Sequence, residues 1–414
     1  MQLIILEDES WRNFKPLSYT RPCFDLMNRE GRLIDQLVGT IRHDGLTGYV
    51  RDYLAEIEEE RHQGIEFNKP PPRDDEALVI NALVRELSIV DKLLKKSEGR
   101  EFVLLNNGRI MAARVRGARL EEAHDPQTLI SLLNELASKV DGYVIDGSHL
   151  YSYPWELLDA GEPPRPPRES GPPIDPRVAV MGEPSELYIA ENVVIEPFTV
   201  LDVRSGPIII EEGCRVSSGS IIMGPSRIGR GSEVLGGRVG PGVFTGPVCK
   251  LSGEIEHTII LGYSNKRHFG YIGHSLIGEW VNIAAGTVGS NLKNTYGEVR
   301  VNTDSGRVSS GRQFLGQLIG DHARTSVGTS IMCGRKLGCF TMSMGLVSQD
   351  LPPFVGVSPE GGLYVLELWS EIATAERMMS RRSVQMTDSY RRLIQILYEV
   401  TAPERGGIAR NSTI

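Results

Sequence analysis

The sequence lacks the features that mark secreted, zinc-binding, membrane or nucleic-acid-binding proteins. Its five cysteines are an odd number, are widely spread, and include no Cys-x-x-Cys pair. This argues against a disulfide framework and a cysteine zinc site, and it indicates free thiols in a reducing compartment. No run of about eighteen apolar residues is present, so no membrane-spanning helix is expected. The net charge of −8 argues against broad nucleic-acid binding.

The start of the chain and its length narrow the possibilities further. Residues 1–8 carry neither a basic leader nor a cleavage site, and their apolar run predicts a strand, so we expect a cytoplasmic protein. The 414 residues are too many for one typical core, and two or three domains are expected. The 45 glycines exceed average usage and concentrate in the second half, where tight corners need them.

That second half repeats aliphatic residues at intervals of six. The spacing recurs in three series: Ile210, Val216, Ile222, Ile228 and Val234; Ile277 and Ile283; and Ile319, Thr325, Ile331 and Leu337. An amphipathic helix would use intervals of three and four, and a half-buried strand would alternate at two, so the spacing predicts a parallel β-helix. Each flat side contributes one inward residue, and three sides make a coil of about eighteen residues.

The chain divides into four regions. Residues 1–160 show short buried strands and two helical patterns, at 83–96 and 126–140, which predict an α/β domain. The proline-rich stretch 161–176 predicts a semi-rigid linker. The β-helix is expected over 177–358. Residues 359–414 predict a helical cap that closes the solenoid, followed by a frayed tail from 403.

The segment 263–291 places a histidine, cations and amides inside a repeat that does not itself require them. Acyl transfer to an amine needs a general base, and His268 is the candidate. The small residues 284–286 would let a backbone N–H approach the developing oxyanion. A sugar phosphate needs cations, which Lys266, Arg267 and Lys293 would supply.

This segment resembles the acetyltransferase half of the bifunctional glucosamine-1-phosphate N-acetyltransferase/N-acetylglucosamine-1-phosphate uridyltransferase family, and it looks closest to the family's short-headed branch. The family has a catalytic His, a Tyr three residues later, then Ile-Gly-x-x-Val-Asn-Ile-Gly-Ala-Gly-Thr and an Asn. The resemblance implies a left-handed β-helix, acetyl-CoA as co-substrate, a homotrimer and catalysis by His268. It also implies sugar-phosphate contacts by Tyr271, Asn282, Asn291, Arg238 and Lys293, and acetyl-CoA contacts by Ala285 and Ser326. One departure is Glu256, where the family has a lysine.

Residues 6–22, Leu-Glu-Asp-Glu-Ser-Trp-Arg-Asn-Phe-Lys-Pro-Leu-Ser-Tyr-Thr-Arg-Pro, resemble the signature of sugar-phosphate nucleotidyltransferases. A loop after the first strand of an α/β sheet is a natural phosphate site. The resemblance implies Mg²⁺ and UTP, a catalytic role for Arg12, and substrate contacts by Lys15, Arg21, Asn81 and Gly108. The head is thus predicted as a shortened Rossmann-like nucleotidyltransferase domain.

The same loop departs from the family in ways that put the activity in question. Acidic residues 7–9 stand where glycines are expected, so backbone N–H groups are less able to cradle phosphate, although an acidic loop would instead suit a metal. The Mg²⁺ ligand is left open among Asp8, Asp141 and Asp146. The head is also shorter than usual, which is compatible with an inert domain kept for assembly.

Several functions therefore stay open. The leading interpretation is a bifunctional enzyme that acetylates glucosamine-1-phosphate and then transfers a uridylyl group from UTP to the product. The alternatives are an amino-sugar N-acyltransferase with an inactive head, a sugar-1-phosphate nucleotidyltransferase of other specificity, a zinc carbonic anhydrase, and a non-catalytic trimeric scaffold. The carbonic anhydrase needs convergent histidines, whereas His268 and His274, six apart, fall on successive faces. No nucleic-acid or membrane partner is expected.

Overall fold

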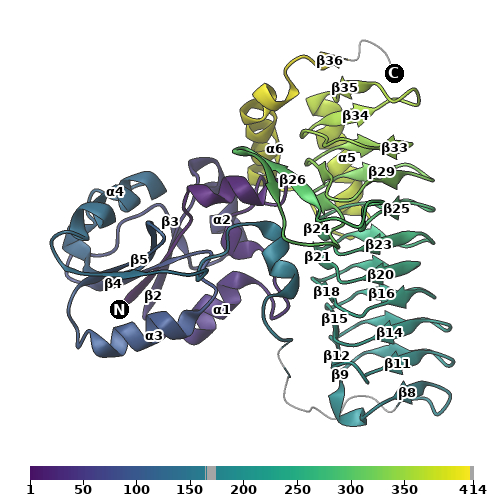
Figure 1. Cartoon of the computed structure of the whole chain (residues 1–414), viewed down its shortest axis with the longest axis horizontal. Coiled ribbons are helices and arrows are strands. Elements are labelled where there is room, and N and C mark those ends of the chain that lie inside the picture. The colour runs from purple at the N-terminus through teal and green to yellow at the C-terminus, as the bar shows by residue number, and fades with distance from the viewer. Residues whose placement is uncertain (164, 166–173, 411–414) are drawn as a thin grey trace.

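Short apolar strands and helices alternate through the first 145 residues and form one mixed sheet covered by helices. The structure is a computed structural model that describes residues 1–163, 165 and 174–410 (Figure 1). The strand order is β3 (Glu66–Phe67), β2 (Gly45–Tyr49), β1 (Gln2–Leu6), β4 (Glu76–Asn81), β6 (Arg109–Arg116), β5 (Phe102–Asn106) and β7 (Asp141–Ile145). Only β6 runs antiparallel to its neighbours. The helices are α1 (Leu33–Thr40), α2 (Asp52–Arg61), α3 (Leu87–Lys96) and α4 (Pro126–Leu136).

The chain reverses its direction of travel across this sheet at β1 and β4. It moves outward from β1 through β2 to β3, then returns to pair β4 with the other edge of β1. In open α/β sheets, ligands bind beside the carboxyl ends of strands at such a switch point. The predicted Rossmann-like head is confirmed, and the predicted helices at 83–96 and 126–140 correspond to α3 and α4.

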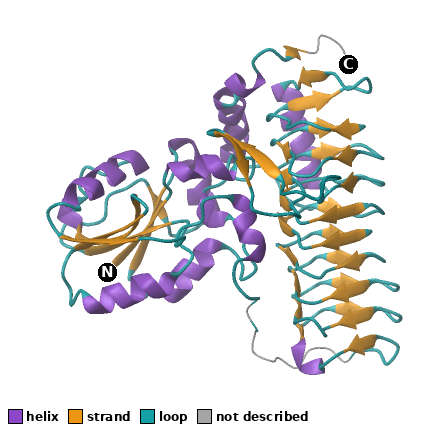
Figure 2. Ribbon diagram, viewed as in Figure 1, coloured by secondary structure: helices purple, strands orange, loops and turns teal. Residues whose placement is uncertain are grey.

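The second half forms the predicted left-handed β-helix, a stack of coils with three flat faces (Figure 2). Face 1 consists of β8 (Ala179–Met181), β11 (Val200–Asp202), β14 (Ile221–Met223), β17 (Arg238–Val239), β20 (Glu254–Glu256), β23 (Tyr271–Gly273), β25 (Val288–Gly289), β30 (Ser330–Ile331) and β33 (Leu346–Val347). Face 2 consists of β9 (Leu187–Ile189), β12 (Ile208–Ile210), β15 (Ser226–Ile228), β18 (Val243–Thr245), β21 (Ile259–Gly262), β24 (Leu276–Glu279), β28 (Leu318–Ile319) and β31 (Lys336–Leu337).

Face 3 is made of two runs of strands joined by one bridging residue. Its strands are β10 (Val194–Ile195), β13 (Arg215–Val216), β16 (Glu233–Val234), β19 (Lys250–Leu251), β22 (Asn265–Lys266), β29 (Arg324–Thr325), β32 (Met342–Ser343), β34 (Val355–Val357), β35 (Leu363–Val365) and β36 (Ala409–Arg410). Asn282 pairs with Asn265 below and Arg324 above, and so connects the two runs.

The six-residue spacing follows the inward positions of successive faces. Ile210, Val216, Ile222, Ile228 and Val234 are all buried in the β-helix core. The coil length varies more than the predicted eighteen residues. Register partners are eighteen apart for Ile208 and Ser226, but sixteen apart for Arg238 and Glu254. The repeat is therefore a property of each face, while the corners differ in length.

Two additions to the β-helix reach the head. A hairpin of β26 (Arg300–Thr303) and β27 (Gly306–Ser309) is inserted between β25 and β28. Helices α5 (Leu368–Ser380) and α6 (Asp388–Val400) form the predicted cap, but α6 lies between the β-helix and the head instead of closing the solenoid end (Figure 1). The tail predicted to fray contains a 3-10 turn, η6 (Ala402–Arg405), and β36; residues 411–414 of that prediction lie outside the described ones.

An aromatic ladder at the corner between faces 2 and 3 supports α6. The stacked rings are those of Tyr263, Trp280, His322, Phe340 and Phe354, with adjacent centroids 4.3 to 6.1 Å apart. The hydroxyl of Tyr390, on α6, forms a 2.8 Å hydrogen bond with Nε2 of His322. The stacked rings thus form a flat apolar surface against which α6 packs.

The predicted linker at 161–176 lies largely outside the described residues, at 164 and 166–173. The last head element, η4 (Pro154–Asp159), precedes it, and β8 follows it. No described helix is long and apolar enough to cross a membrane.

Candidate active sites

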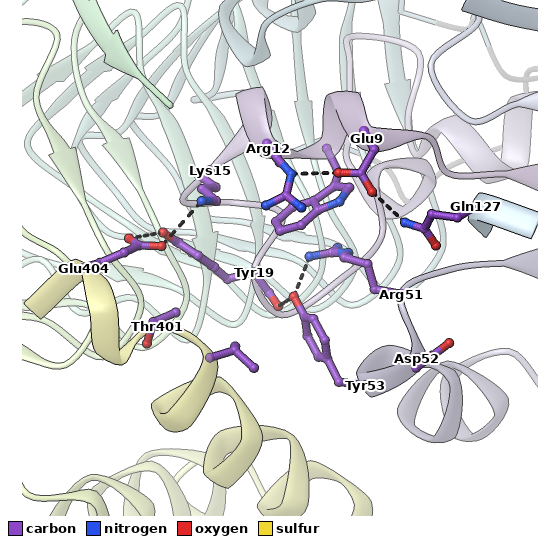
Figure 3. A pocket seen from close by; sticks show the side chains of 12 residues that line it. Glu9, Arg12, Lys15, Tyr19, Arg51, Asp52, Tyr53, Gln127, Thr401 and Glu404 are labelled. Atoms are coloured by element: carbon purple, nitrogen blue, oxygen red, sulfur yellow. Dashed lines mark hydrogen bonds and ion pairs between the residues drawn. The ribbon is translucent and has the colours of Figure 1, made fainter. Parts of the chain in front are cut away.

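A pocket of about 460 Å³ lies where the head meets the C-terminal cap (Figure 3). Most of its head residues come from the loop after β1 and from the start of α2 after β2, at the carboxyl ends of those strands, and Gln127 comes from the start of α4. Val400, Thr401 and Glu404 of the cap complete it. The full lining is Glu9, Trp11, Arg12, Lys15, Tyr19, Arg51, Asp52, Tyr53, Gln127, Val400, Thr401 and Glu404.

The pocket combines cations with aromatic rings. The Arg51 guanidinium lies 4.0 Å from the centroid of the Trp11 ring, and Lys15 lies within 6 Å of the rings of Trp11 and Tyr19. A planar guanidinium binds phosphate oxygens in pairs, while aromatic rings stack on bases and sugars. The composition therefore suits a nucleotide.

Two of the cations in the pocket, Arg12 and Lys15, already have acidic partners. Arg12 pairs with Glu9 at 2.7 Å, and Lys15 pairs with Asp304 of the β26–β27 hairpin at 2.8 Å and with Glu404 at 3.4 Å. The Tyr19 hydroxyl donates to Glu404 at 2.5 Å, and burial raises the pKa of Tyr19 well above its ordinary value. An incoming triphosphate would have to replace these carboxylates.

Of the head residues predicted from sequence, the pocket brings together Arg12 and Lys15 only. Arg21 is buried outside it, where its guanidinium forms ion pairs with Asp321 and, at 3.1 Å, with Glu279 of the β-helix. Asn81 is buried and donates to Asp8 and to the carbonyl of Ile110, each at 2.9 Å. Gly108 lies in an exposed turn with positive φ, away from the pocket.

The acidic loop turns out to have structural partners. Glu7 is buried, accepts from the Cys23 amide and pairs with Arg51 at 3.0 Å, and burial raises its pKa. Asp8 caps η1 (Glu9–Phe14) by accepting from the Ser10 amide and also pairs with Arg109. Only Glu9 of the three faces the pocket.

Most residues that line the pocket were not predicted from the sequence as site residues. Arg51 directly precedes α2 at the end of β2, and recognising the strand 45–49 would have placed it at the sheet's carboxyl edge. Tyr53 follows on the first turn of α2. Nothing in the sequence signals Glu404, because its partners lie nearly 400 residues away.

The second candidate site is a polar network on face 1. The Tyr271 hydroxyl donates to Glu256 at 2.5 Å and accepts from Asn291 at 2.6 Å. The same amide nitrogen of Asn291 lies 2.9 Å from His274 Nδ1, which must therefore be an unprotonated acceptor. A Cβ on Gly273 would fall 2.2 Å from the Tyr271 hydroxyl oxygen, so the network requires glycine there.

Two members of this network had not been predicted to act there. Glu256, the apparent departure from the family, is one coil below Tyr271 and Gly273, with Gly273 as its register partner. His274 is half-buried and stacks between His257 and Phe314. Burial and the neighbouring His257 lower the pKa of His274 to about 4.

His268 lies at the corner between faces 3 and 1, with an exposed side chain. The strand before it places Lys266 inside the β-helix, where its ammonium donates to the carbonyls of Ser252 (3.2 Å) and His268. Burial lowers the pKa of Lys266 to about 8. A core lysine thus fixes the backbone of the corner that carries His268.

The other residues predicted for the acetyl site lie on face 1, on face 3, at the corner between these faces, and in the insertion after β25. Arg238 is on face 1, two coils below Tyr271 in the same register column, and Lys293 follows Asn291 in the insertion and donates to the Glu298 carbonyl. Ala285 and Ser326 occupy corners equivalent to that of His268 on the next two coils. Asn282 faces away, on face 3, where it accepts a 2.7 Å hydrogen bond from Asn265.

Parts of this chain are similar to known sugar nucleotidyltransferases and acetyltransferases. Residues 3–160 match the family described as Sugar nucleotidyl transferase. A bifunctional sugar-1-phosphate nucleotidylyltransferase/acetyltransferase of Sulfurisphaera tokodaii is 39% identical over 143 residues, which cover 33% of this chain and 34% of that relative. The bifunctional protein GlmU of Methanocaldococcus jannaschii is 35% identical over 102 residues, covering 24% of this chain and 25% of the relative.

A solved structure, UDP-N-acetylglucosamine acyltransferase from Arabidopsis, covers 57% of this chain and 96% of its own, at 14% identity and a TM-score of 0.29. The fold rests on the strand pairing described above and not on this score. The matches with the two bifunctional relatives span about a third or less of their lengths. Their names agree with the resemblance predicted from residues 6–22 and 263–291, and that prediction is confirmed.

Proposed function

We propose that this chain is a bifunctional enzyme of nucleotide-sugar synthesis, with uridylyl transfer in the pocket and acetyl transfer at the corner of His268. The observation that carries the proposal is the coexistence of two sites. A pocket of cations and aromatic rings lies at the carboxyl edge of the head sheet, and a separate polar network lies on face 1. The bifunctional relative from S. tokodaii supports the pairing.

For uridylyl transfer, a phosphate oxygen of N-acetylglucosamine-1-phosphate attacks the α-phosphate of UTP and pyrophosphate leaves. In this proposal Arg12 and Lys15 bind the triphosphate, and Arg51 with Trp11 binds the groups next to it; their shared position in the pocket supports these roles. Mg²⁺, which the resemblance implies, prefers carboxylate oxygens, and the exposed Asp52 in the pocket fits that preference best, because both oxygens of Glu9 are used by Arg12 and Gln127. When bound, it would offset negative charge on the phosphates. The protein's own contribution is positioning.

Three other carboxylates are less suited to hold that ion. Asp8 is used by Asn81 and Arg109, and Asp141 begins β7, so it lies at the amino end of that strand, where it pairs with Arg100. Asp146 follows β7 and is exposed outside the pocket.

For acetyl transfer, the amine of glucosamine-1-phosphate attacks the thioester carbonyl of acetyl-CoA as His268 takes its proton, and the CoA thiolate leaves. In this proposal Tyr271 and Asn291, which are hydrogen-bonded to each other, contact the sugar, and the corner at Ala285 approaches the oxyanion and the cofactor. Asn282, on face 3, is omitted from the proposed site of this chain's own face 1.

An acetyl site built on one flat face of a β-helix would be shallow, and we propose that a homotrimer completes it. Four exposed apolar side chains lie at, or just before, strands of face 1 next to the site: Phe269 (71% exposed), Val288 (45%), Val327 (76%) and Leu346 (63%). Such a column on a soluble protein favours burial against another copy.

A second candidate is an acetyltransferase with an inert head. It is favoured by the acidic partners that Arg12 and Lys15 already have in the pocket. The two functions are separated by incubating purified protein with glucosamine-1-phosphate, acetyl-CoA, UTP and Mg²⁺ and analysing products by mass spectrometry. The bifunctional proposal expects UDP-N-acetylglucosamine and pyrophosphate. Accumulation of N-acetylglucosamine-1-phosphate alone supports the inert head, and no acetylated sugar contradicts both.

A further inference from the structure

A buried cluster in the head belongs to neither candidate site. It consists of Asp25 at the end of η2 (Cys23–Asp25), and of Glu58 and His62, one turn apart at the end of α2. Their side chains are 6%, 0% and 9% exposed. One donor atom from each lies within 4.8 Å of the others. None of the three lines the pocket.

The hydrogen bonds among the described residues leave one carboxylate oxygen of this cluster without a donor, with an ion-pair contact from His62 beside it. His62 Nε2 lies 3.0 Å from both oxygens of Asp25 and 3.4 Å from Glu58 Oε2. Glu58 Oε1 accepts from Arg61 at 2.7 Å, but no described residue donates a hydrogen bond to Oε2. A fully buried carboxylate oxygen without a hydrogen-bond donor is unfavourable. Because the same nitrogen of His62 faces both carboxylates, a cation in place of its proton would contact all three side chains at once.

We propose that Asp25, Glu58 and His62 bind a divalent transition-metal ion. One imidazole nitrogen and two carboxylates, in a compact buried arrangement, are ligands that Zn²⁺, Mn²⁺ and Co²⁺ accept. Mg²⁺ and Ca²⁺ prefer oxygen ligands only, so the histidine distinguishes this site from that of the Mg²⁺ used with a nucleotide. The inference does not depend on the proposed function.

The surroundings assign the ion a structural role. Arg61, which holds the other oxygen of Glu58, also donates to the carbonyl of Thr20 at 2.8 Å. Thr20 in turn donates to Asp321 of the β-helix at 2.7 Å. The ion would join η2 to α2 beside the segment that holds the head on the β-helix. A side chain that hydrogen-bonds to a metal ligand in this way orients that ligand toward the ion.

The test uses the full chain, stripped with chelator and then given Zn²⁺, Co²⁺ or Mn²⁺ alone. We expect one bound ion per chain by elemental analysis, a higher thermal midpoint, and visible Co²⁺ absorption of a low-coordinate site. Glu58→Gln keeps the side-chain shape and should weaken metal affinity by at least about 10–100-fold. Glu59→Gln, one position along α2 and half-exposed, is the matched control and should bind like the parent.

The results that overturn the proposal are equally specific. A stripped parent that binds less than about a tenth of an equivalent of all three metals, with an unchanged thermal midpoint, would overturn it. So would Glu58→Gln binding as tightly as the parent, because the ion would then lie elsewhere. If Glu58→Gln does not fold, anomalous diffraction from zinc-loaded parent crystals decides the question: a peak between the three side chains supports the site, and a peak elsewhere or none rejects it.

Discussion

At the scale of single residues, an arginine predicted to touch the nucleotide instead joins the head to the β-helix. Arg21 is buried against Asp321 and Glu279. We expect Arg21→Ala to lower the free energy of unfolding by about 3–5 kcal/mol, because it leaves buried carboxylates unpaired. Arg12→Ala, at a half-exposed position in the pocket, should change it by less than about 0.5 kcal/mol yet abolish pyrophosphate release.

Denaturant unfolding and a pyrophosphate assay on both variants measure this contrast. Full stability in Arg21→Ala together with loss of uridylyl transfer would return Arg21 to a substrate role. The sequence alone could not distinguish the roles of the two arginines, because both follow β1 in the segment 6–22 that resembles a phosphate loop. Only the contact with Asp321, 300 residues away, distinguishes them.

For acetyl transfer, His268→Ala should lower the rate by roughly 10²–10⁴-fold through loss of the general base. UTP-dependent activity should be unchanged. A variant of His274 would be a poor control, since His274 belongs to the face-1 network and accepts a hydrogen bond from Asn291. His43→Ala, in the loop before β2, is a cleaner comparison and should be neutral. An acetylation rate for His268→Ala within a few-fold of the parent would remove His268 from the mechanism.

His274 gives the face-1 network a pH dependence. Burial, and then His257, lower its pKa from 6.5 to about 4, with Glu256, Asp159 and Arg312 as the other charged groups facing it. The unfolded chain therefore binds more protons between these values, and stability should fall as pH decreases from about 6.5 to about 4. Urea midpoints at pH 7 and pH 5 measure the fall. His274→Asn should reduce it, and an unchanged difference would assign it to other groups.

Among the elements, the repeat and the helices of the cap were predictable, but the position of the cap was not. Each inward aliphatic residue of a face fills the β-helix core, so the six-residue spacing from Ile210 to Val234 directly indicates the fold. The helices of the cap have ordinary amphipathic patterns that do not say what they cover. Their position depends on the aromatic ladder, whose members are spread over successive coils. The network of Glu256, Tyr271 and Asn291 was likewise hidden until the coil length fixed which residues stack.

The turn after α6 supplies an acidic group to the pocket, and we expect it to compete with the triphosphate. Glu404 contacts Lys15 and Tyr19. Glu404→Gln should lower the KM for nucleoside triphosphate by about two- to five-fold, the size of a partly exposed ion pair, with little change in kcat. Glu399→Gln, exposed on α6, is the control. Steady-state kinetics that show a lower kcat instead would make Glu404 part of the catalytic apparatus.

At the scale of the whole molecule, the exposed apolar column on face 1 predicts a homotrimer that only the acetyl site requires. Replacing both Phe269 and Val327 with Asp should give monomers in sedimentation velocity, with acetyl transfer lost and UTP-dependent activity kept. Val144→Asp, at a site that is 70% exposed in the head, should leave assembly unchanged. A parent protein that is monomeric and fully active in acetyl transfer would contradict the trimer.

The pocket between the head and the C-terminal cap also constrains how the protein is synthesised. Lys15 and Glu404, which meet there, are separated by 389 residues. At about 5–20 residues per second, a ribosome needs about 20–80 s to connect them. The head strands and each β-helix coil contact near neighbours in sequence and are able to form as they emerge. A nascent chain therefore carries a head whose pocket is incomplete. A chain released before η6 is made contains the β-helix coils but lacks the side of the pocket that η6 supplies.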